Sequence, residues 1–268
     1  MTEINRYALM MEALNELKPE IDATRPTKPA PALPRELDLR PSLSEVLAGY
    51  DPMPPGALFL GVASDDLPVL LNLHDPVPGP VLIAADPGAG KTALLQTITL
   101  AAGKMHHPED LQFGVLTNHP DEWSGFEAIP NNVGVFPLYN QSSEDFILSL
   151  ASWAHGNKTS EQSVLLLLDD LEAASNLDFD ARQNLRWLLL RGPARRVWPI
   201  ITLNPSRVEN ILPWLDAFRT RVFGTMRNRR QIEQLDAVSA ELESLNSGSH
   251  FTLREGESWL RFWIPSID

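Results

Sequence analysis

Short apolar runs alternate with amphipathic stretches through most of the chain. The runs have the length of strands and lie at 81–85, 111–116, 133–138, 163–169, 198–203 and 221–225. The stretches with apolar residues at helical spacing lie at 91–105, 144–154, 180–191, 207–216 and 229–245. Because the two kinds of segment follow one another in turn, the pattern predicts an α/β fold with a mainly parallel sheet and helices on both faces.

Two predicted hairpins flank this alternation. The first joins apolar runs at 57–62 and 67–73 around Ser64-Asp65-Asp66, and the second joins 250–254 to 259–263 around residues 255–257. A short helix is expected at 42–47. Ser142 with Asp145, and Ser206 with Glu209, resemble capping boxes, so we expect helices to begin next to them.

The N-terminal segment differs from the rest in composition. Ile4, Tyr7, Met11 and Leu14 lie at helical spacing, which predicts an amphipathic helix that docks on the body or on a partner. A proline-rich stretch at 19–41 follows and is typical of a semi-rigid linker. We therefore expect a docking helix at 1–18, a linker at 19–56 and a single domain at 57–268.

Composition and charge limit the possible functions. The 268 residues include 43% hydrophobic residues and no cysteine, which supports a sizeable core and excludes disulfides and thiolate zinc sites. The segment 181–230 holds eleven arginines and two acidic residues, although the net charge of the chain is −13. Such a division suggests that one face meets nucleic acid, a nucleotide or an acidic neighbour, although solvated helix charges would give the same count. We expect no membrane insertion and a cytoplasmic location, because no apolar run could span a bilayer and no leader is evident.

The strongest chemical signal is residues 81–92, VLIAADPGAGKT. An apolar strand, a turn of small residues and Lys91-Thr92 at the start of a helix form the layout of a P-loop, which binds nucleotide phosphates. The backbone of the turn wraps the phosphates, the lysine reaches their outer oxygens and the threonine hydroxyl holds Mg²⁺. We expect the phosphates to be bound by Asp86, Pro87, Gly88, Ala89, Gly90, Lys91 and Thr92. The pattern asks for glycine at position 85, where this chain has Ala85.

A second motif supplies carboxylates beside that loop. The apolar run at 164–168 ends in Asp169 and Asp170, at the carboxyl edge of the predicted sheet, where ligands of α/β proteins bind. Asp169 is expected to hold Mg²⁺ together with Thr92, and Asp170 to orient the attacking water. Glu172 is a reserve candidate that we expect to point away along the following helix. Alternatively, the two aspartates only cap a helix.

Further candidates lie at later strand ends. Asn204 follows the run 198–203, where an amide could contact the γ-phosphate and the attacking water, or could simply form a turn before Pro205. Arg195, Arg196 and Arg221 are candidates for an arginine that completes the site of a neighbouring subunit. The sequence does not select one of the three.

The order of these segments resembles that of the FtsK/HerA superfamily of ring-forming ATPases. Thr202-Leu-Asn204-Pro205-Ser206 is similar to the family's Ala-Thr-Gln-Arg-Pro-Ser, and Phe218-Arg-Thr-Arg221 is similar to its Pro-Thr-Arg. The segment 111–130 and the closing hairpin have counterparts in the same order, so that the resemblance covers about 57–264.

The resemblance implies a RecA-like core, a hexameric ring, ATP and Mg²⁺ as ligands, and translocation of duplex DNA. It also implies the roles given above for Lys91, Thr92, Asp169, Asp170 and Asn204. Three residues depart from the family pattern, since Ala85 replaces Gly, Asp170 replaces Glu and Asn204 replaces Gln. The DNA-reading winged-helix domain and membrane anchor of FtsK have no counterpart, which weakens the inference to fast DNA pumping.

Three functions remain open on the sequence. The first is an oligomeric ATPase motor that acts on duplex DNA. The second is an ATPase that powers a protein assembly or secretion complex, with a protein partner bound through residues 1–41. The third is a slow nucleotide-dependent switch or scaffold, which the three substitutions at the site favour.

Overall fold

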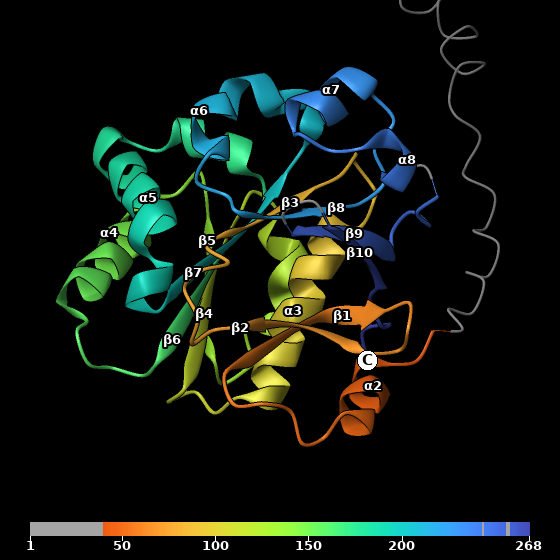
Figure 1. Cartoon of the computed structure of the whole chain (residues 1–268). Coiled ribbons are helices and arrows are strands. Elements are labelled where there is room, and N and C mark those ends of the chain that lie inside the picture. The colour runs from red at the N-terminus through yellow and green to blue at the C-terminus, as the bar shows by residue number, and fades with distance from the viewer. Residues whose placement is uncertain (1–39, 243, 256–257) are drawn as a thin grey trace, which may run out of the picture. The chain divides into compact units, whose positions relative to one another are not determined.

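A computed structural model describes residues 40–242, 244–255 and 258–268 (Figure 1). The predicted docking helix at 1–18 and most of the predicted linker lie outside these residues. Pro41–Asp268 forms one compact unit. That unit begins before the expected domain start at 57, because helix α2 (Leu43–Gly49), capped by Ser42, buries Leu43 in the same body.

The described strands form one mixed sheet in the order β2-β1-β10-β9-β8-β3-β7-β6-β4-β5. The strands from β8 to β5 are mutually parallel, and the two hairpins β1–β2 and β9–β10 extend the sheet antiparallel beyond β8. This arrangement confirms the fold class predicted from the sequence. The bounds are β1 Ala57–Ala63, β2 Pro68–Asn72, β3 Val81–Ala84, β4 Leu111–Thr117, β5 Asn132–Pro137, β6 Ser163–Leu168, β7 Val197–Leu203, β8 Thr220–Phe223, β9 His250–Glu255 and β10 Ser258–Trp263.

Helices pack on both faces of the sheet (Figure 1). One face carries α3 (Lys91–Met105) and the 3-10 helix η1 (Pro120–Phe126), whereas the other carries α4 (Gln141–Gly156) and α5 (Phe179–Arg191). β6 lies between these layers, and its alternate leucines enter the two core clusters. A strand buried on both faces reads as a continuous apolar run, which explains the run seen in the sequence.

The register of the parallel strands brings their carboxyl ends to one edge. Ala84 of β3 pairs with Leu203 of β7 on one side and with Phe223 of β8 on the other, and Leu168 of β6 pairs with Ile201 of β7. The residues that follow β3, β6, β7 and β8 therefore meet at this edge, where a ligand site is expected in an open α/β sheet.

Both predicted capping boxes are wrong. α4 begins at Gln141 after Asn140, so that Ser142 lies inside the helix. Asn204, not Ser206, caps the next helical segment, since Pro205 sets the backbone for a first helical position one residue earlier. That segment is the 3-10 helix η4 (Pro205–Ile211) followed by α6 (Leu212–Leu215), in place of the single helix predicted at 207–216.

The helix predicted at 229–245 is also interrupted. α7 (Arg229–Gln234) ends at Gln234, with Leu235 as its C-cap, and α8 (Ser239–Leu242) begins after a left-handed residue, Asp236, with φ of 57°. Asp236 accepts hydrogen bonds from the Arg254 guanidinium of β9 through its backbone and side-chain oxygens. The apolar periodicity of this segment alone favours one helix. In the structure a turn at Asp236, which contacts β9, separates α7 from α8.

Candidate functional site

The loop between β3 and α3 has the geometry of a phosphate-binding cradle. Gly88 and Gly90 have φ of 76° and 91°, a conformation that only glycine adopts without strain. Gly90 caps α3 without a side-chain hydrogen bond, so the first N–H groups of the helix are left for another acceptor. The Lys91 ammonium lies over the loop and donates to the carbonyl oxygens of Ala85, at 2.9 Å, and Asp86, at 3.3 Å.

Ala85 fits this loop because a glycine, Gly224, faces it from the residue after the neighbouring strand β8. Ala85 is fully buried and does not belong to the residues with positive φ, so the methyl group causes no backbone strain. A Cβ placed on Gly224, directly after β8, would lie 2.8 Å from the Ala85 Cβ. This chain has alanine where the P-loop pattern has glycine at position 85. The space for the alanine methyl group exists because Gly224 has no side chain.

A chain of hydrogen bonds joins the two motifs. Thr92 Oγ1 donates to Asp169 Oδ2 at 2.9 Å, and Thr202 Oγ1 of β7 donates to Asp169 Oδ1 at 2.7 Å. The Thr202 hydroxyl in turn accepts from the backbone N–H of Asp170 at 2.8 Å. Sequence reasoning gave Thr202 no role, although a hydroxyl in the otherwise apolar run at 197–203 was a visible signal.

These atoms suit a nucleotide with magnesium. Thr92 Oγ1 and Asp169 Oδ2 are oxygen donors of the kind that Mg²⁺ prefers, and they already lie in contact. The cradle beside them offers backbone N–H groups and one ammonium, which are the donors that phosphates require. Nothing fills the position that a Cβ on Gly88 would take, so this part of the loop is open to a ligand.

Burial perturbs the charged groups of the site. It raises the pKa of Asp170 above the ordinary value, with a further increase from Asp169, while Lys91 and His119 oppose the change. Burial lowers the pKa of Lys91, against the attraction of the surrounding carboxylates. Asp170 also has φ of 80°, in the left-handed region that costs energy for a residue other than glycine. Perturbed groups and backbone strain gather at functional sites in many proteins.

Asn204 and Glu172 lie together at the end of β7. The Asn204 side-chain oxygen accepts from the Ser206 N–H at 3.1 Å and from its hydroxyl at 2.9 Å, so the amide does form a turn. Glu172, on the 3-10 helix η2 (Leu171–Asn176), accepts from the Asn204 N–H at 3.5 Å. The expectation that Glu172 points away is therefore wrong, since a 3-10 helix after Asp170 turns this side chain toward β7.

The three candidate arginines lie apart from the P-loop of their own chain. Arg195, in η3 (Pro193–Arg195), and Arg196 precede β7 at the opposite edge of the sheet, where they donate to the carbonyls of Asn157 and Leu73. Arg221 is half-buried in β8 and donates to three carbonyls, those of Phe218, Leu235 and Leu215. Each arginine thus has a structural contact within its own chain, and an action in trans stays a prediction.

Two C-terminal segments brace the P-loop. Asp86 donates its N–H to the Thr225 carbonyl at 3.0 Å, and its carboxylate accepts from the Arg227 N–H at 3.1 Å. Gly248 donates to the Ala89 carbonyl at 3.3 Å. A Cβ on Gly90 would lie 2.6 Å from the Gly248 oxygen, so glycine is required at Gly90 for packing as well as for conformation.

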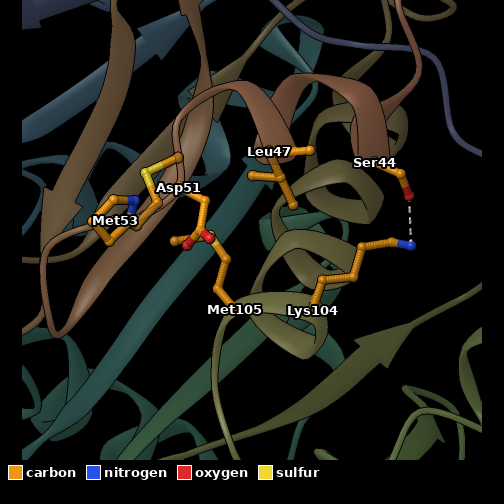
Figure 2. A pocket seen from close by; sticks show the side chains of 8 residues that line it. Ser44, Leu47, Asp51, Met53, Lys104 and Met105 are labelled. Carbon is orange, nitrogen blue, oxygen red and sulfur yellow. Dashed lines mark hydrogen bonds between the residues drawn. The ribbon is translucent and has the colours of Figure 1, made fainter.

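A groove of about 420 Å³ lies at the other end of α3 (Figure 2). Lys104 bridges to the Ser44 hydroxyl at 2.9 Å across its rim, and Met53, Met105 and Leu47 contribute apolar walls. It lies at the last turn of α3, whereas Lys91 begins the helix, so the groove is separate from the P-loop.

Comparison with solved structures identifies the fold. The cytoplasmic domain of the type VII secretion ATPase EccC from Thermomonospora curvata matches 84% of this chain with a TM-score of 0.64 and 16% identity, over 32% of its own length. ATPases 2 and 3 of EssC from Geobacillus thermodenitrificans match 81% with a TM-score of 0.63 and 14% identity, over 48% of that chain. The chain thus spans less than half of these EccC and EssC chains.

The monomer form of the pCW3 conjugation coupling protein TcpA, solved with ATPγS, matches 80% of this chain with a TM-score of 0.65 and 13% identity, over 67% of its length. These proteins are P-loop ATPases of the FtsK/SpoIIIE type. The likeness, at 13–16% identity, shows that this chain has the fold of these ATPases. No protein-family profile matches the chain, and no curated protein matches it in sequence. In the part of the chain that the structure describes, no helix has the length and hydropathy needed to cross a bilayer.

Proposed function

We propose that this protein binds Mg·ATP at the P-loop and hydrolyses it. One observation carries the proposal, namely the 2.9 Å contact between Thr92 Oγ1 and Asp169 Oδ2 at the start of a helix whose first residue is Lys91. Two distant sequence motifs, of the types that bind phosphate and magnesium, meet there at the carboxyl edge of the sheet. The fold shared with P-loop ATPases supports the same conclusion.

The proposed roles follow the chemistry of each side chain. Residues 86–92 hold the phosphates, and Thr92 and Asp169 hold the metal, which neutralises charge on the transferring phosphoryl group when bound. Asp170 accepts a hydrogen bond from the attacking water, and Asn204 donates its amide N–H to the γ-phosphate. Arg195, Arg196 and Arg221 remain the candidates for the group supplied by a neighbouring subunit.

Calorimetry and turnover test this function. Purified protein should bind Mg·ATP and release phosphate, and Lys91→Ala should lose both because the phosphates lose their ammonium partner. Lys104→Ala, at the far end of the same helix, is the matched control and should keep both. Absence of Mg·ATP binding by the unmodified protein would overturn the proposal.

The ATPase is further proposed to act as an oligomeric motor, a hexameric ring, on duplex DNA in the cytoplasm. Three exposed arginines support an anionic cargo. Arg207 lies on η4, Arg227 precedes α7 and Arg229 begins α7, which packs on η4. At low salt, duplex DNA should raise the ATPase rate, and its binding should weaken steeply as salt rises because Lys and Arg contacts release counterions. An ATPase rate unchanged by duplex DNA at low salt would reject this cargo.

A protein cargo is the second candidate. The similarity to the secretion ATPases EccC and EssC favours it, and EccC has also been solved with a signal sequence peptide. In this case a protein partner should bind through residues 1–41, so deletion of those residues should abolish its capture. Retention of every captured partner after the deletion would count against this candidate.

A further inference from the structure

The Glu172 side chain lies against the end of β7, a position that the sequence pattern does not predict. Glu172 lies three residues after Asp169, in the 3-10 helix η2, and is partly buried between η2 and the end of β7. Its Oε2 accepts from the Asn204 N–H at 3.5 Å, and η2 and η4 pack on each other at this point. A carboxylate is costly to remove from water unless it is hydrogen-bonded or paired with a charge.

The same carboxylate lies within the electrostatic field of the phosphate site. Its pKa is raised chiefly by burial, with a further increase from the charge of Asp170 and a smaller opposing effect from Lys91, so these charged groups of the site lie near it. The bond from Asn204 to Glu172 joins the end of β7 to η2, and the hydrogen bonds of Thr202 join β7 to Asp169 and Asp170, so both contacts link β7 to the segment after β6.

The side-chain amide nitrogen of Asn204 is available to donate a hydrogen bond. The Asn204 side-chain oxygen is held by the backbone and hydroxyl of Ser206, and no residue in the described part of the chain accepts from its Nδ2. The amide can therefore donate a hydrogen bond but cannot accept one from water. The direction of this donor depends on the backbone conformation of Asn204. That backbone is held by the N-cap contact with Ser206 and by the hydrogen bond from the Asn204 N–H to Glu172.

We propose that Glu172 is a positioning residue of the ATPase reaction, which holds the backbone of Asn204 so that the Asn204 Nδ2 group meets the γ-phosphate. The inference rests on the proposed ATPase function. In this role Glu172 acts through Asn204, since its Oε2 accepts from the backbone N–H of that residue. The bond makes the end of β7 part of the nucleotide site and lets it distinguish ATP from ADP.

Two substitutions at Glu172 separate this role from that of a base. Glu172→Gln keeps an oxygen that can accept from Asn204 N–H, whereas Glu172→Ala removes it. We expect kcat to fall about tenfold in Glu172→Ala, with KM changed less than about threefold, because misplacement of a contact weakens the transition state more than binding. Glu172→Gln should retain most of the turnover.

A binding measurement gives a second readout that needs no hydrolysis. Calorimetry with Mg·ATPγS and with Mg·ADP yields the ratio of the two affinities for each variant. That ratio should fall several-fold in Glu172→Ala and in Asn204→Ser, which keeps a capping oxygen but lacks the amide donor. The double variant should lose no more than either single one, as expected for two residues in one pathway.

Glu144→Ala is the matched control. Glu144 also accepts from a backbone N–H, that of Asp178 at 2.8 Å, but outside the phosphate site. Glu144→Ala should leave both the affinity ratio and kcat unchanged. It thus controls for the general effect of losing a hydrogen bond between a carboxylate and a backbone N–H.

Several results would overturn the proposal. They are unchanged kcat and affinity ratio in Glu172→Ala, equal losses in Glu172→Gln and Glu172→Ala, or additive losses in the double variant. The proposed ATPase function fails by a different result, namely absence of Mg·ATP binding in the unmodified protein. The results above instead compare kcat and nucleotide affinities among variants that still bind nucleotide.

Discussion

At the scale of single residues, the loop accommodates the methyl group of Ala85 because Gly224 has no side chain beside it. The methyl of Ala85 and a methyl on Gly224 would compete for one volume between β3 and β8. Interior packing is dense, so such a conflict displaces backbone or neighbouring side chains.

We predict that Gly224→Ala destabilises the protein by about 1–3 kcal/mol, the usual cost of overpacking. Its Cβ would lie 2.8 Å from that of Ala85 and 3.2 Å from the Phe251 ring. Denaturant unfolding measures the change. In an Ala85→Gly background the same substitution should cost less, and an equal cost in both backgrounds would show that the two positions do not compete.

Asp170 combines a strained backbone with a buried charge. We predict that Asp170→Asn stabilises the protein by up to about 1 kcal/mol, reduced by solvent screening of the partly exposed charge. Asparagine also tolerates the left-handed conformation. Turnover should fall on the order of 100-fold, since a neutral amide oxygen is a much weaker base toward the attacking water than a carboxylate. A rate close to that of the unmodified protein would favour the slow switch.

The pH dependence of stability follows from the same carboxyl groups. The folded-state pKa values of Asp170 and Glu172 are raised, chiefly by burial, above the ordinary values of 3.8 and 4.5. The folded state thus binds more protons between the ordinary and the raised pKa. This contribution to stability is complete below the ordinary pKa and is lost as pH rises through the raised one. Unfolding of Asp170→Asn should therefore show a weaker loss of stability over that window, and identical pH profiles would contradict the assignment.

At the scale of elements, the arginines of 181–230 hold helices and strands together as well as supplying charge. Arg221 joins the segment before β8 to the end of α7 through three carbonyls. Burial lowers the pKa of its guanidinium, which is consistent with removal from water.

We predict that Arg221→Lys destabilises the protein by about 1–3 kcal/mol, because one ammonium cannot satisfy three carbonyls that a planar fork reaches. Arg195→Lys, which disturbs one such side-chain bond, is the control and should cost less. Thermal or denaturant unfolding decides between them. Unchanged stability with abolished turnover in Arg221→Lys would instead indicate that Arg221 acts on a neighbour's nucleotide.

At the scale of the whole molecule, we propose that a second copy of the chain completes the site. None of the three candidate arginines contacts the P-loop residues of its own chain in the described structure. A group supplied in trans would make turnover depend on assembly.

We predict that mixing two inactive variants restores activity. A subunit with Lys91→Ala keeps its arginine, and a subunit with the acting arginine changed to alanine keeps its P-loop, so a mixed ring contains complete sites. Arg195→Ala and Arg196→Ala are each mixed with Lys91→Ala, and phosphate release is measured. Additive residual rates for both mixtures, despite loss of activity in each variant alone, would rule out these two arginines as groups that act in trans.

The sequence by itself predicted the features that depend on residues close together in the chain. The apolar runs predicted the strands, the glycine-rich turn predicted the cradle around Lys91, and Asp169 followed a run that only a central strand explains. Strand and helix periodicity, turn residues and the order of motifs are all properties of short segments, so the sequence sufficed for the fold class and for both halves of the proposed metal site.

Contacts between distant segments were decided only by the tertiary structure. The Thr202 hydroxyl bonds to Asp169 because β6 and β7 are neighbours in register, and Glu172 turns to Asn204 because η2 is a 3-10 helix packed on η4. The space that Gly224 leaves for Ala85, the carbonyls around Arg221 and the turn at Asp236 likewise depend on pairing between elements. Such pairings arise from packing of the folded chain, and no local pattern of residues encodes them.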